Sequence, residues 1–121
     1  MGDRANFGFR DSKENVLFLY GHWAGHDMLA KLANAVSAAE PRWEDESYAT
    51  RICISRLIAE DWTSETGWGL YVNQIGDNEH KVPVIDWRNQ TFTLYEEDLN
   101  TVVFSLSLAA FVDKYSRLVM V

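Results

Sequence analysis

Residues 26–41, with the sequence HDMLAKLANAVSAAEP, constrain the fold most, because they carry apolar side chains at the spacing of an α-helix. Asp27 lies in or near the predicted first turn, where a negative charge suits the helix dipole, and Pro41 closes the helix. The apolar stripe consists of Leu29, Leu32, Ala33, Val36 and Ala39. Such a one-sided helix needs an apolar partner surface, which predicts packing against a sheet or another helix.

The segments around this helix predict a hairpin before it and a second helix after it. Residues 5–10 (ANFGFR) alternate in polarity, and residues 16–23 (VLFLYGHW) form an apolar run beyond the polar turn 11–15. Residues 45–62 (DESYATRICISRLIAEDW) predict the second helix, because apolar side chains recur there at helical spacing. The recurring side chains are Ile54, Leu57 and Ile58.

The C-terminal half predicts a three-stranded meander followed by a short helix. The expected strands are 68–75 (WGLYVNQI), 81–87 (KVPVIDW) and 91–96 (TFTLYE), and Pro83 favours an edge position for its strand. Residues 107–115 (SLAAFVDKY) predict the helix. The order is therefore ββ-α-α-βββ-α, an α+β fold with helices packed on a mostly antiparallel sheet.

Length and charge restrict the class of protein further. A chain of 121 residues predicts a single globular domain, 1–121, and a formal net charge of −7 argues against general nucleic-acid binding. The longest apolar run, VVFSLSLAAFV, is shorter than the ~20 residues of a membrane span, so we expect no membrane association. Cys53 is the single cysteine, which excludes an internal disulfide, and its apolar neighbours predict a buried, inert thiol. We expect a cytoplasmic protein.

The stretch YGHWAGHD, residues 20–27, is the first candidate site. Its two histidines are four residues apart, but Trp23 stands where a zincin has glutamate, and two glycines disfavour one continuous helix. A helix that opens near His26 would present free N–H groups to an anion, with Trp23 for stacking and His22 for a hydrogen bond. This pattern favours a phosphate-bearing or nucleotide-like ligand. The alternative is a purely structural strand-to-helix corner around a core tryptophan.

The sequence GDNEH, residues 76–80, is typical of an ordinary tight turn. It also contains an acid/base pair, Glu79 and His80. If this turn lies close to the YGHWAGHD stretch, side chains from both could bind a divalent metal. Such a site would support a hydrolase. That ligand set would be Asp77, His22, His26 and Asp86. Sequence alone leaves their convergence open.

Two further features are compatible with ligand binding. In the segment ETGWG, Glu65 and Trp68 lie where a mobile loop could cover a ligand, although the glycines also suit a simple turn. Arg4 and Arg51 are the basic residues of interest. Because Arg51 is beside the apolar Ile52, we expect it to be partly buried and paired with a carboxylate or a ligand phosphate.

The motifs MGDRANF, LYGHWAG, YATRI, ETGWG and DNEHKVPVID, in this order, resemble a group of small proteins of tailed phages and phage-derived bacterial genes. The resemblance covers most of the chain and implies no secure activity. It implies that nine residues belong to the defining pattern: Arg4, Asn6, His22, Trp23, Arg51, Glu65, Asp77, Asn78 and His80. Polar residues spread over several loops fit a pocket better than a core.

We therefore expect a non-enzymatic, phage-type protein that sequesters a small anionic, nucleotide-derived ligand, such as a host immune signal, in the host cytoplasm. The expected ligand-binding residues are Arg4, Asn6, His22, Trp23, His26, Arg51, Glu65, Trp68, Asp77, Asn78 and His80. No cofactor, metal or catalytic residue is assigned, and a homo-oligomer is left open. The alternatives are a small hydrolase or phosphodiesterase on a nucleotide-like substrate, and an acidic protein that inhibits a host protein by surface contact.

Overall fold

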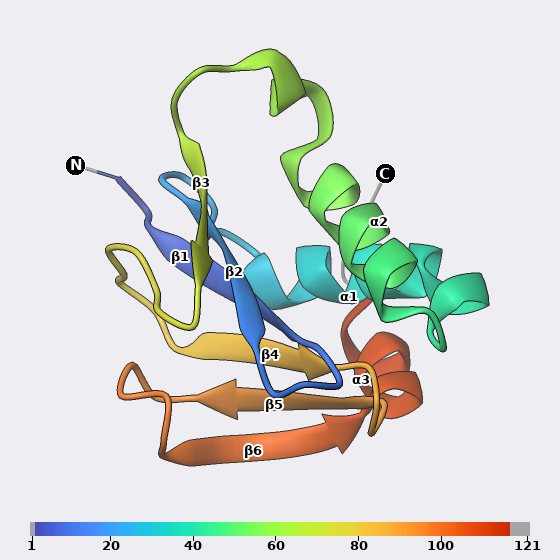
Figure 1. Ribbon diagram of the computed structural model, residues 1–121. Coiled ribbons are helices and arrows are strands. Elements are labelled where there is room, and N and C mark those ends of the chain that lie inside the picture. The colour runs from blue at the N-terminus through green and yellow to red at the C-terminus, as the bar shows by residue number, and fades with distance from the viewer. Residues whose placement is uncertain (1, 117–121) are drawn as a thin grey trace.

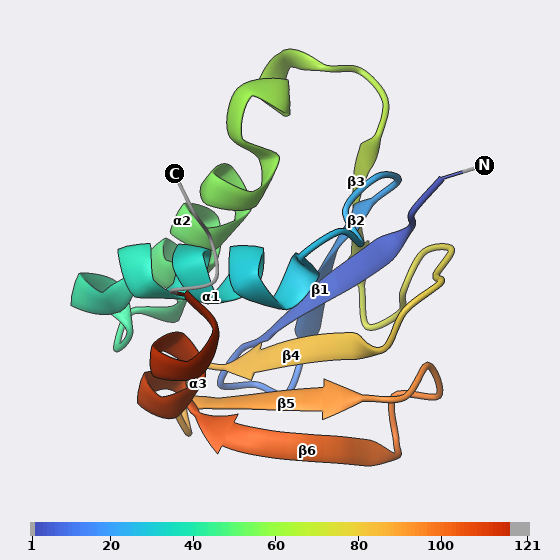
Figure 2. The same cartoon turned by 180° about the vertical axis from the view of Figure 1, so that it is seen from behind.

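The computed structural model describes residues 2–116. Within that range the chain forms β1 (Ala5–Arg10), β2 (Val16–Gly21), α1 (Met28–Ala38), η1 (Glu40–Arg42), α2 (Glu46–Ile58), η2 (Ala59–Thr63), β3 (Trp68–Val72), β4 (Val82–Asp86), β5 (Thr91–Tyr95), β6 (Val102–Ser107) and α3 (Leu108–Tyr115). The helices lie on one side of a twisted sheet, as the two opposite views show (Figures 1 and 2). The α+β class is confirmed.

The sheet has six strands in the order β3-β2-β1-β4-β5-β6. The neighbouring strands are antiparallel except β1 and β4, which pair in parallel. The predicted meander is therefore wrong, because β3 returns to the edge beside β2 while β4 enters the centre beside β1. The edge position expected from Pro83 is also wrong. The β1–β4 register begins at Val84, so the missing N–H of Pro83 removes no bond from that pairing.

Strand β6 was not predicted from the sequence. It runs directly into α3, and the Ser107 hydroxyl at the junction accepts a hydrogen bond from the Ala110 N–H at 3.1 Å. No glycine or proline separates the two elements, so the sequence carries no punctuation between strand and helix. The short C-terminal helix itself is confirmed.

The main core lies between the helices and one face of the sheet. Leu32, Ala33, Val36 and Ala39 of the predicted stripe are buried there, and Leu29 is partly buried. Cys53 on α2 is also buried, as expected, and burial raises the pKa of its thiol to about 12. The helical stripe therefore fixes which side of the sheet is covered.

A smaller apolar cluster occupies the opposite face of the sheet. Its buried members, Val16, Phe18, Val82 and Val84, are covered by partly buried side chains from the loops and β-strand ends: Tyr71, Ile75, Tyr95 and Leu99. The loop after β3 thus packs on this face, which brings residues 76–80 back towards β1. Among residues 2–116, none of the helices is long and apolar enough to cross a membrane.

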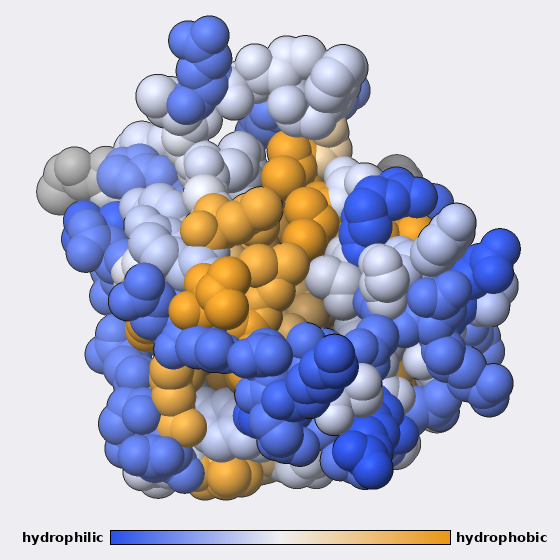
Figure 3. Space-filling model, in the orientation of Figure 1, coloured by the Kyte–Doolittle hydropathy of each residue, from blue (hydrophilic) through white to orange (hydrophobic). Residues whose placement is uncertain are grey.

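Helix α2 packs mainly against α1, η1 and η2 and stands away from the edge of the sheet. The chain then passes from η2 through residues 64–67, which we call the arch, and descends into β3 (Figure 1). Apolar surface is visible between β3 and α2 below the arch (Figure 3). This arrangement leaves a groove that the sequence did not reveal.

Candidate functional site

The groove has a volume of about 780 Å³ and lies between α1, the C-terminal part of α2, η2, the arch and the first residue of β3. Phe7 and Ala35 contribute apolar wall, and Ser64 and Thr66 of the arch contribute hydroxyl groups. A cavity of this size suits a nucleotide-sized molecule, since small-molecule sites span roughly 300–1,000 Å³. The α1–α2 packing and the arch together create it.

Two predicted site residues, Trp23 and Trp68, line this groove. Trp23 is 66% exposed, and the His22 ring packs edge to face against it at a centroid distance of 4.7 Å. His22 Nδ1 in turn lies 3.0 Å from the Tyr20 hydroxyl. The Trp68 Nε1 donates to Asp61 Oδ2 at 3.4 Å. The groove therefore has two aromatic side chains, one exposed and one anchored.

Two cations that the sequence reasoning missed, Lys31 on α1 and Arg56 on α2, also line the groove. Both are exposed, and within residues 2–116 neither has a carboxylate oxygen within 4.0 Å. Glu60 and Asp61 line the groove from η2. The two helices thus supply positive charge and η2 supplies negative charge.

No local pattern marks Lys31 or Arg56 in the sequence. Each is an isolated basic residue beside apolar helix positions, which is also typical of an ordinary solvated helix face. They belong to one site only because the α1–α2 packing and the arch bring their two helices to the same groove.

Five other predicted residues, Arg4, Asn6, Asp77, Asn78 and His80, meet in a separate cluster, which we call the corner. Asn6 is fully buried, and its amide nitrogen donates to Asp77 O and to Asn78 Oδ1, both at 3.1 Å. Its Oδ1 accepts from the Gly76 N–H at 3.0 Å. A buried amide with three hydrogen bonds fixes the loop after β3 onto β1.

The charged side chains of the corner are paired with one another. The Arg4 guanidinium lies 3.7 Å from Asp77 Oδ2 and 3.4 Å from Glu79 Oε2. Glu79 also accepts from the Arg4 backbone N–H at 2.8 Å. That backbone hydrogen bond, with the Arg4 side chain as a further cause, lowers the pKa of the Glu79 carboxyl below its ordinary value. Arg4 is therefore already paired inside the protein.

The segments that contain His22, Glu65 and His80 meet in the structure, which the sequence alone left open. The Asp3 N–H donates to His22 O at 2.8 Å, and the His22 N–H donates to Gly67 O of the arch at 2.8 Å. His80 Nε2 is paired with Asp3 Oδ1, and a β-carbon placed on Gly25 would overlap both atoms. The YGHWAGHD stretch is thus the junction between the corner and the groove.

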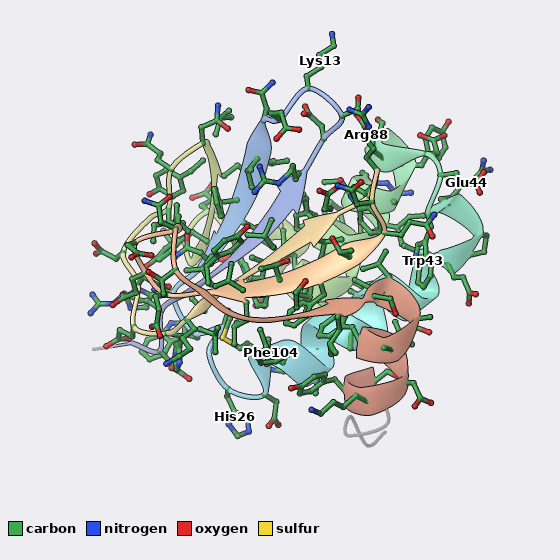
Figure 4. The ribbon with its side chains drawn as sticks, turned by 90° about the horizontal axis from the view of Figure 1, so that it is seen from below. Lys13, His26, Trp43, Glu44, Arg88 and Phe104 are labelled. Carbon is green, nitrogen blue, oxygen red and sulfur yellow. The ribbon has the colours of Figure 1, made fainter. Side chains whose placement is uncertain are left out.

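The remaining predicted residues lie outside both places. The side chain of His26 is 81% exposed, lies 3.2 Å from Asp27 Oδ2 and points away from the molecule (Figure 4). Helix α1 begins only at Met28, after a left-handed Asp27 with a φ of 54°. Glu65 is exposed in the arch. The expected burial of Arg51 is wrong: it is exposed and donates to Ser55 Oγ at 3.0 Å.

The metal site weighed from the sequence does not assemble. Within residues 2–116, no three or more histidine, cysteine, aspartate or glutamate side chains are grouped so that they could hold a metal ion. His26 is paired with Asp27, and the Asp86 carboxylate accepts hydrogen bonds from Asn89. The set of Asp77, His22, His26 and Asp86 is therefore dispersed.

Comparisons of the chain with protein-family models, curated proteins and solved structures give no match. The function is therefore inferred from the groove and the corner themselves.

Proposed function

We propose that this protein is a ligand-binding module that takes a small anionic, nucleotide-derived molecule into the groove between α1, α2 and the arch. One observation carries the proposal: Trp23, Trp68, Lys31 and Arg56 line the same groove of about 780 Å³. The two cations have no carboxylate partner within residues 2–116, in a chain whose net charge is −7. Unpaired cations beside aromatic rings suit a phosphate attached to a planar base.

The division of charge within the groove supports a nucleotide over a simple anion. Phosphate oxygens would accept from Lys31 and Arg56, while sugar hydroxyls would donate to the carboxylates of Glu60 or Asp61. A base would stack on the exposed Trp23, which lies at the mouth and adds hydrophobic contact. An inorganic phosphate would use only the cationic side. We therefore expect nucleotides to bind more tightly than phosphate.

We further propose a biological context, which follows from the sequence resemblance to tailed-phage proteins. A phage protein that holds a nucleotide-derived signal without converting it would withdraw that signal from the infected host. Sequestration is thus the form of the function that we propose.

The test is isothermal titration calorimetry of the purified protein with ADP-ribose, with a set of cyclic nucleotides and with inorganic phosphate. We expect at least one nucleotide to bind, and Lys31→Ala or Arg56→Ala to weaken it about 10–100-fold, the effect of losing one charge-assisted hydrogen bond. Lys13→Ala and Arg51→Ala are the matched controls, because both side chains are exposed and lie outside the groove. The controls should leave the Kd unchanged.

The bound molecule is then released by denaturation and compared with the molecule that was added. Recovery of the intact nucleotide supports sequestration, whereas a converted product would contradict it and favour the hydrolase. Absence of binding by every nucleotide in the set would contradict both, and would favour inhibition of a host protein by surface contact. Equal loss of affinity in the Arg51 and Arg56 variants would show that the groove is not the site.

A further inference from the structure

We infer that the exposed edge of β3 is a homodimer interface, in which two copies of the chain pair their β3 strands antiparallel about a two-fold axis. Strand β3 is one of the two edges of the sheet and has β2 on one side only. Edge strands present a row of unpaired N–H and C=O groups to any extended partner. This inference does not rest on the ligand proposed for the groove, although Trp68 belongs to both surfaces.

The hydrogen bonds at the two ends of β3 show which of its residues face outward. The His22 N–H donates to Gly67 O, and the Asn73 N–H donates to Val16 O, each at 2.8 Å. Because bonded pairs alternate in an antiparallel ladder, Gly69 and Tyr71 direct their backbone groups to β2. The backbone N–H and C=O groups of Trp68, Leu70 and Val72 therefore point to the free edge.

The same outward residues carry exposed apolar side chains. Leu70 is 59% exposed and Val72 is 61% exposed, and Leu70 lies opposite the buried Leu19 of β2. Apolar surface is visible over this part of the molecule (Figure 3). A partner strand would thus gain both main-chain hydrogen bonds and apolar contact from the same face of β3.

The edge of β3 is a place where two copies of this acidic chain can meet with little charge repulsion. The chain has a net charge of −7, so two copies repel each other over most of their surfaces. The stretch from Thr66 to Gly76, TGWGLYVNQIG, contains no charged residue. Strand β3 also has no proline, lysine or register shift, which are the usual devices that prevent edge pairing. It is a neutral, self-complementary segment.

The other edge strand, β6, is less suited to pairing. Its exposed side chains include the apolar Val102 and Val103 as well as the polar Ser105 and Ser107, but its register with β5 shifts at Leu94/Tyr95. Lys114 Nζ also lies 5.8 Å from the Phe104 ring centre, which places a positive charge beside the strand. Such irregularities and charges are typical of protected edges.

A two-fold axis at Leu70 satisfies the outward groups of both strands. Leu70 would face the partner's Leu70, and Trp68 would face the partner's Val72, which gives about six main-chain hydrogen bonds across the junction. The two sheets would become one continuous sheet of twelve strands, six from each copy. Because one short strand buries less area than a standard interface, we expect a Kd on the order of 1–100 µM.

The test is sedimentation equilibrium of the full chain from about 1 µM to 1 mM, a range that brackets the expected Kd. Wild type should shift from monomer to dimer, while Leu70→Lys and Val72→Pro should stay monomeric. Val72→Pro removes only an outward N–H and therefore spares the β2 ladder. Circular dichroism should show that both variants remain folded. The matched control is Val103→Lys on the β6 edge, which should dimerise like wild type.

The register is tested with Leu70→Cys, since the native Cys53 is buried and does not compete. Mild oxidation should give a covalent dimer through residue 70, while Val103→Cys should not cross-link. A wild type that stays monomeric at 1 mM would overturn the inference. So would dissociation by Val103→Lys instead of Leu70→Lys, or growth into fibres, which indicates pairing of β3 with β6.

Discussion

The corner and the groove lie on either side of the YGHWAGHD stretch and differ in whether their charged side chains are paired within the chain. In the corner, Asn6 makes three hydrogen bonds and the terminal nitrogens of Arg4 are paired with two carboxylates, while the buried Arg4 Nε has no hydrogen bond within residues 2–116. In the groove, Lys31 and Arg56 have no carboxylate partner among residues 2–116. Polar groups that satisfy one another stabilise a fold, whereas unsatisfied ones on a concave surface are available to a ligand.

This difference reassigns the residues that the resemblance singled out. The corner residues Arg4, Asn6, Asp77, Asn78 and His80 were expected to bind a ligand, and the structure gives each of them a partner within the chain. They hold the loop after β3, and with it the junction that supports Trp23. A pattern of polar residues over several loops can therefore define a scaffold as well as a pocket.

The largest expected effect is that of Asn6→Ala on stability. The change leaves the partly buried Gly76 N–H, Asp77 O and Asn78 Oδ1 without their partner, which costs about 2–4 kcal/mol of unfolding free energy. Urea denaturation measures it. Asn34→Ala, an exposed amide in the groove, is the matched control and should change the free energy by less than about 0.5 kcal/mol. Similar losses of unfolding free energy in the two variants would show that the corner is no more structural than the groove.

A smaller loss is expected for Gly25→Ala. A β-carbon at this position overlaps His80 Nε2 and Asp3 Oδ1, so the pair must separate, at a cost of about 1–2 kcal/mol. The control is Gly69→Ala, where the nearest atom to a β-carbon is 3.8 Å away. Thermal denaturation of both variants compares them. A stable Gly25→Ala protein would show that the pair of His80 and Asp3 does not hold the junction.

Glu79 predicts how the stability of the corner depends on pH. Its pKa is lowered in the folded state, mainly by the hydrogen bond from the Arg4 N–H, so the ionised carboxylate stabilises the fold above its unfolded pKa. This contribution is lost as the pH falls from about 4.5 through the lower folded value. Urea denaturation between pH 7 and pH 3 should show a shallower acid loss for Glu79→Gln than for wild type.

The control for this pH series is Glu65→Gln, which replaces an exposed carboxylate of the arch. Its pH profile should match that of wild type. Asp98 retains its own contribution in both variants, because hydrogen bonds from Thr101 and Asn100 lower its pKa as well. Some acid loss therefore persists in Glu79→Gln, and an unchanged profile would show that the Arg4–Glu79 contact does not stabilise the corner.

The sequence predicted those parts of the fold that depend on local periodicity. The stripe of α1, the hairpin of β1 and β2, and the helix around Cys53 follow from residues close together in the chain. The sheet order could not be predicted this way, because pairing β4 with β1 instead of β3 depends on contacts more than seventy residues apart, such as Gly8 with Val84. Strand β6 was missed because it joins α3 without a turn residue.

The site residues also divide into those that local sequence identifies and those that only the tertiary structure reveals. Trp23 and Trp68 could be selected because each is a tryptophan within two residues of glycines on both sides, and both line the groove. Lys31 and Arg56 could not be selected, because a single basic residue on a helix has no distinguishing context. Their importance comes from the angle of α2 to the sheet and from the arch, which are tertiary features. Asn6 shows the converse, since its burial identifies it as structural.

The smallest expected effect on stability is that of removing the groove cations. Lys31→Ala and Arg56→Ala should each change the unfolding free energy by less than about 0.5 kcal/mol, because neither side chain has an ion pair to lose among residues 2–116. Arg4→Ala is the matched comparison: it removes both carboxylate contacts of the corner and should cost more than either groove variant. If Arg56→Ala proved as destabilising as Arg4→Ala, the groove cations would be structural. If the Lys31 and Arg56 variants keep the stability of wild type but lose nucleotide binding, the groove cations form a binding surface and are not part of the scaffold.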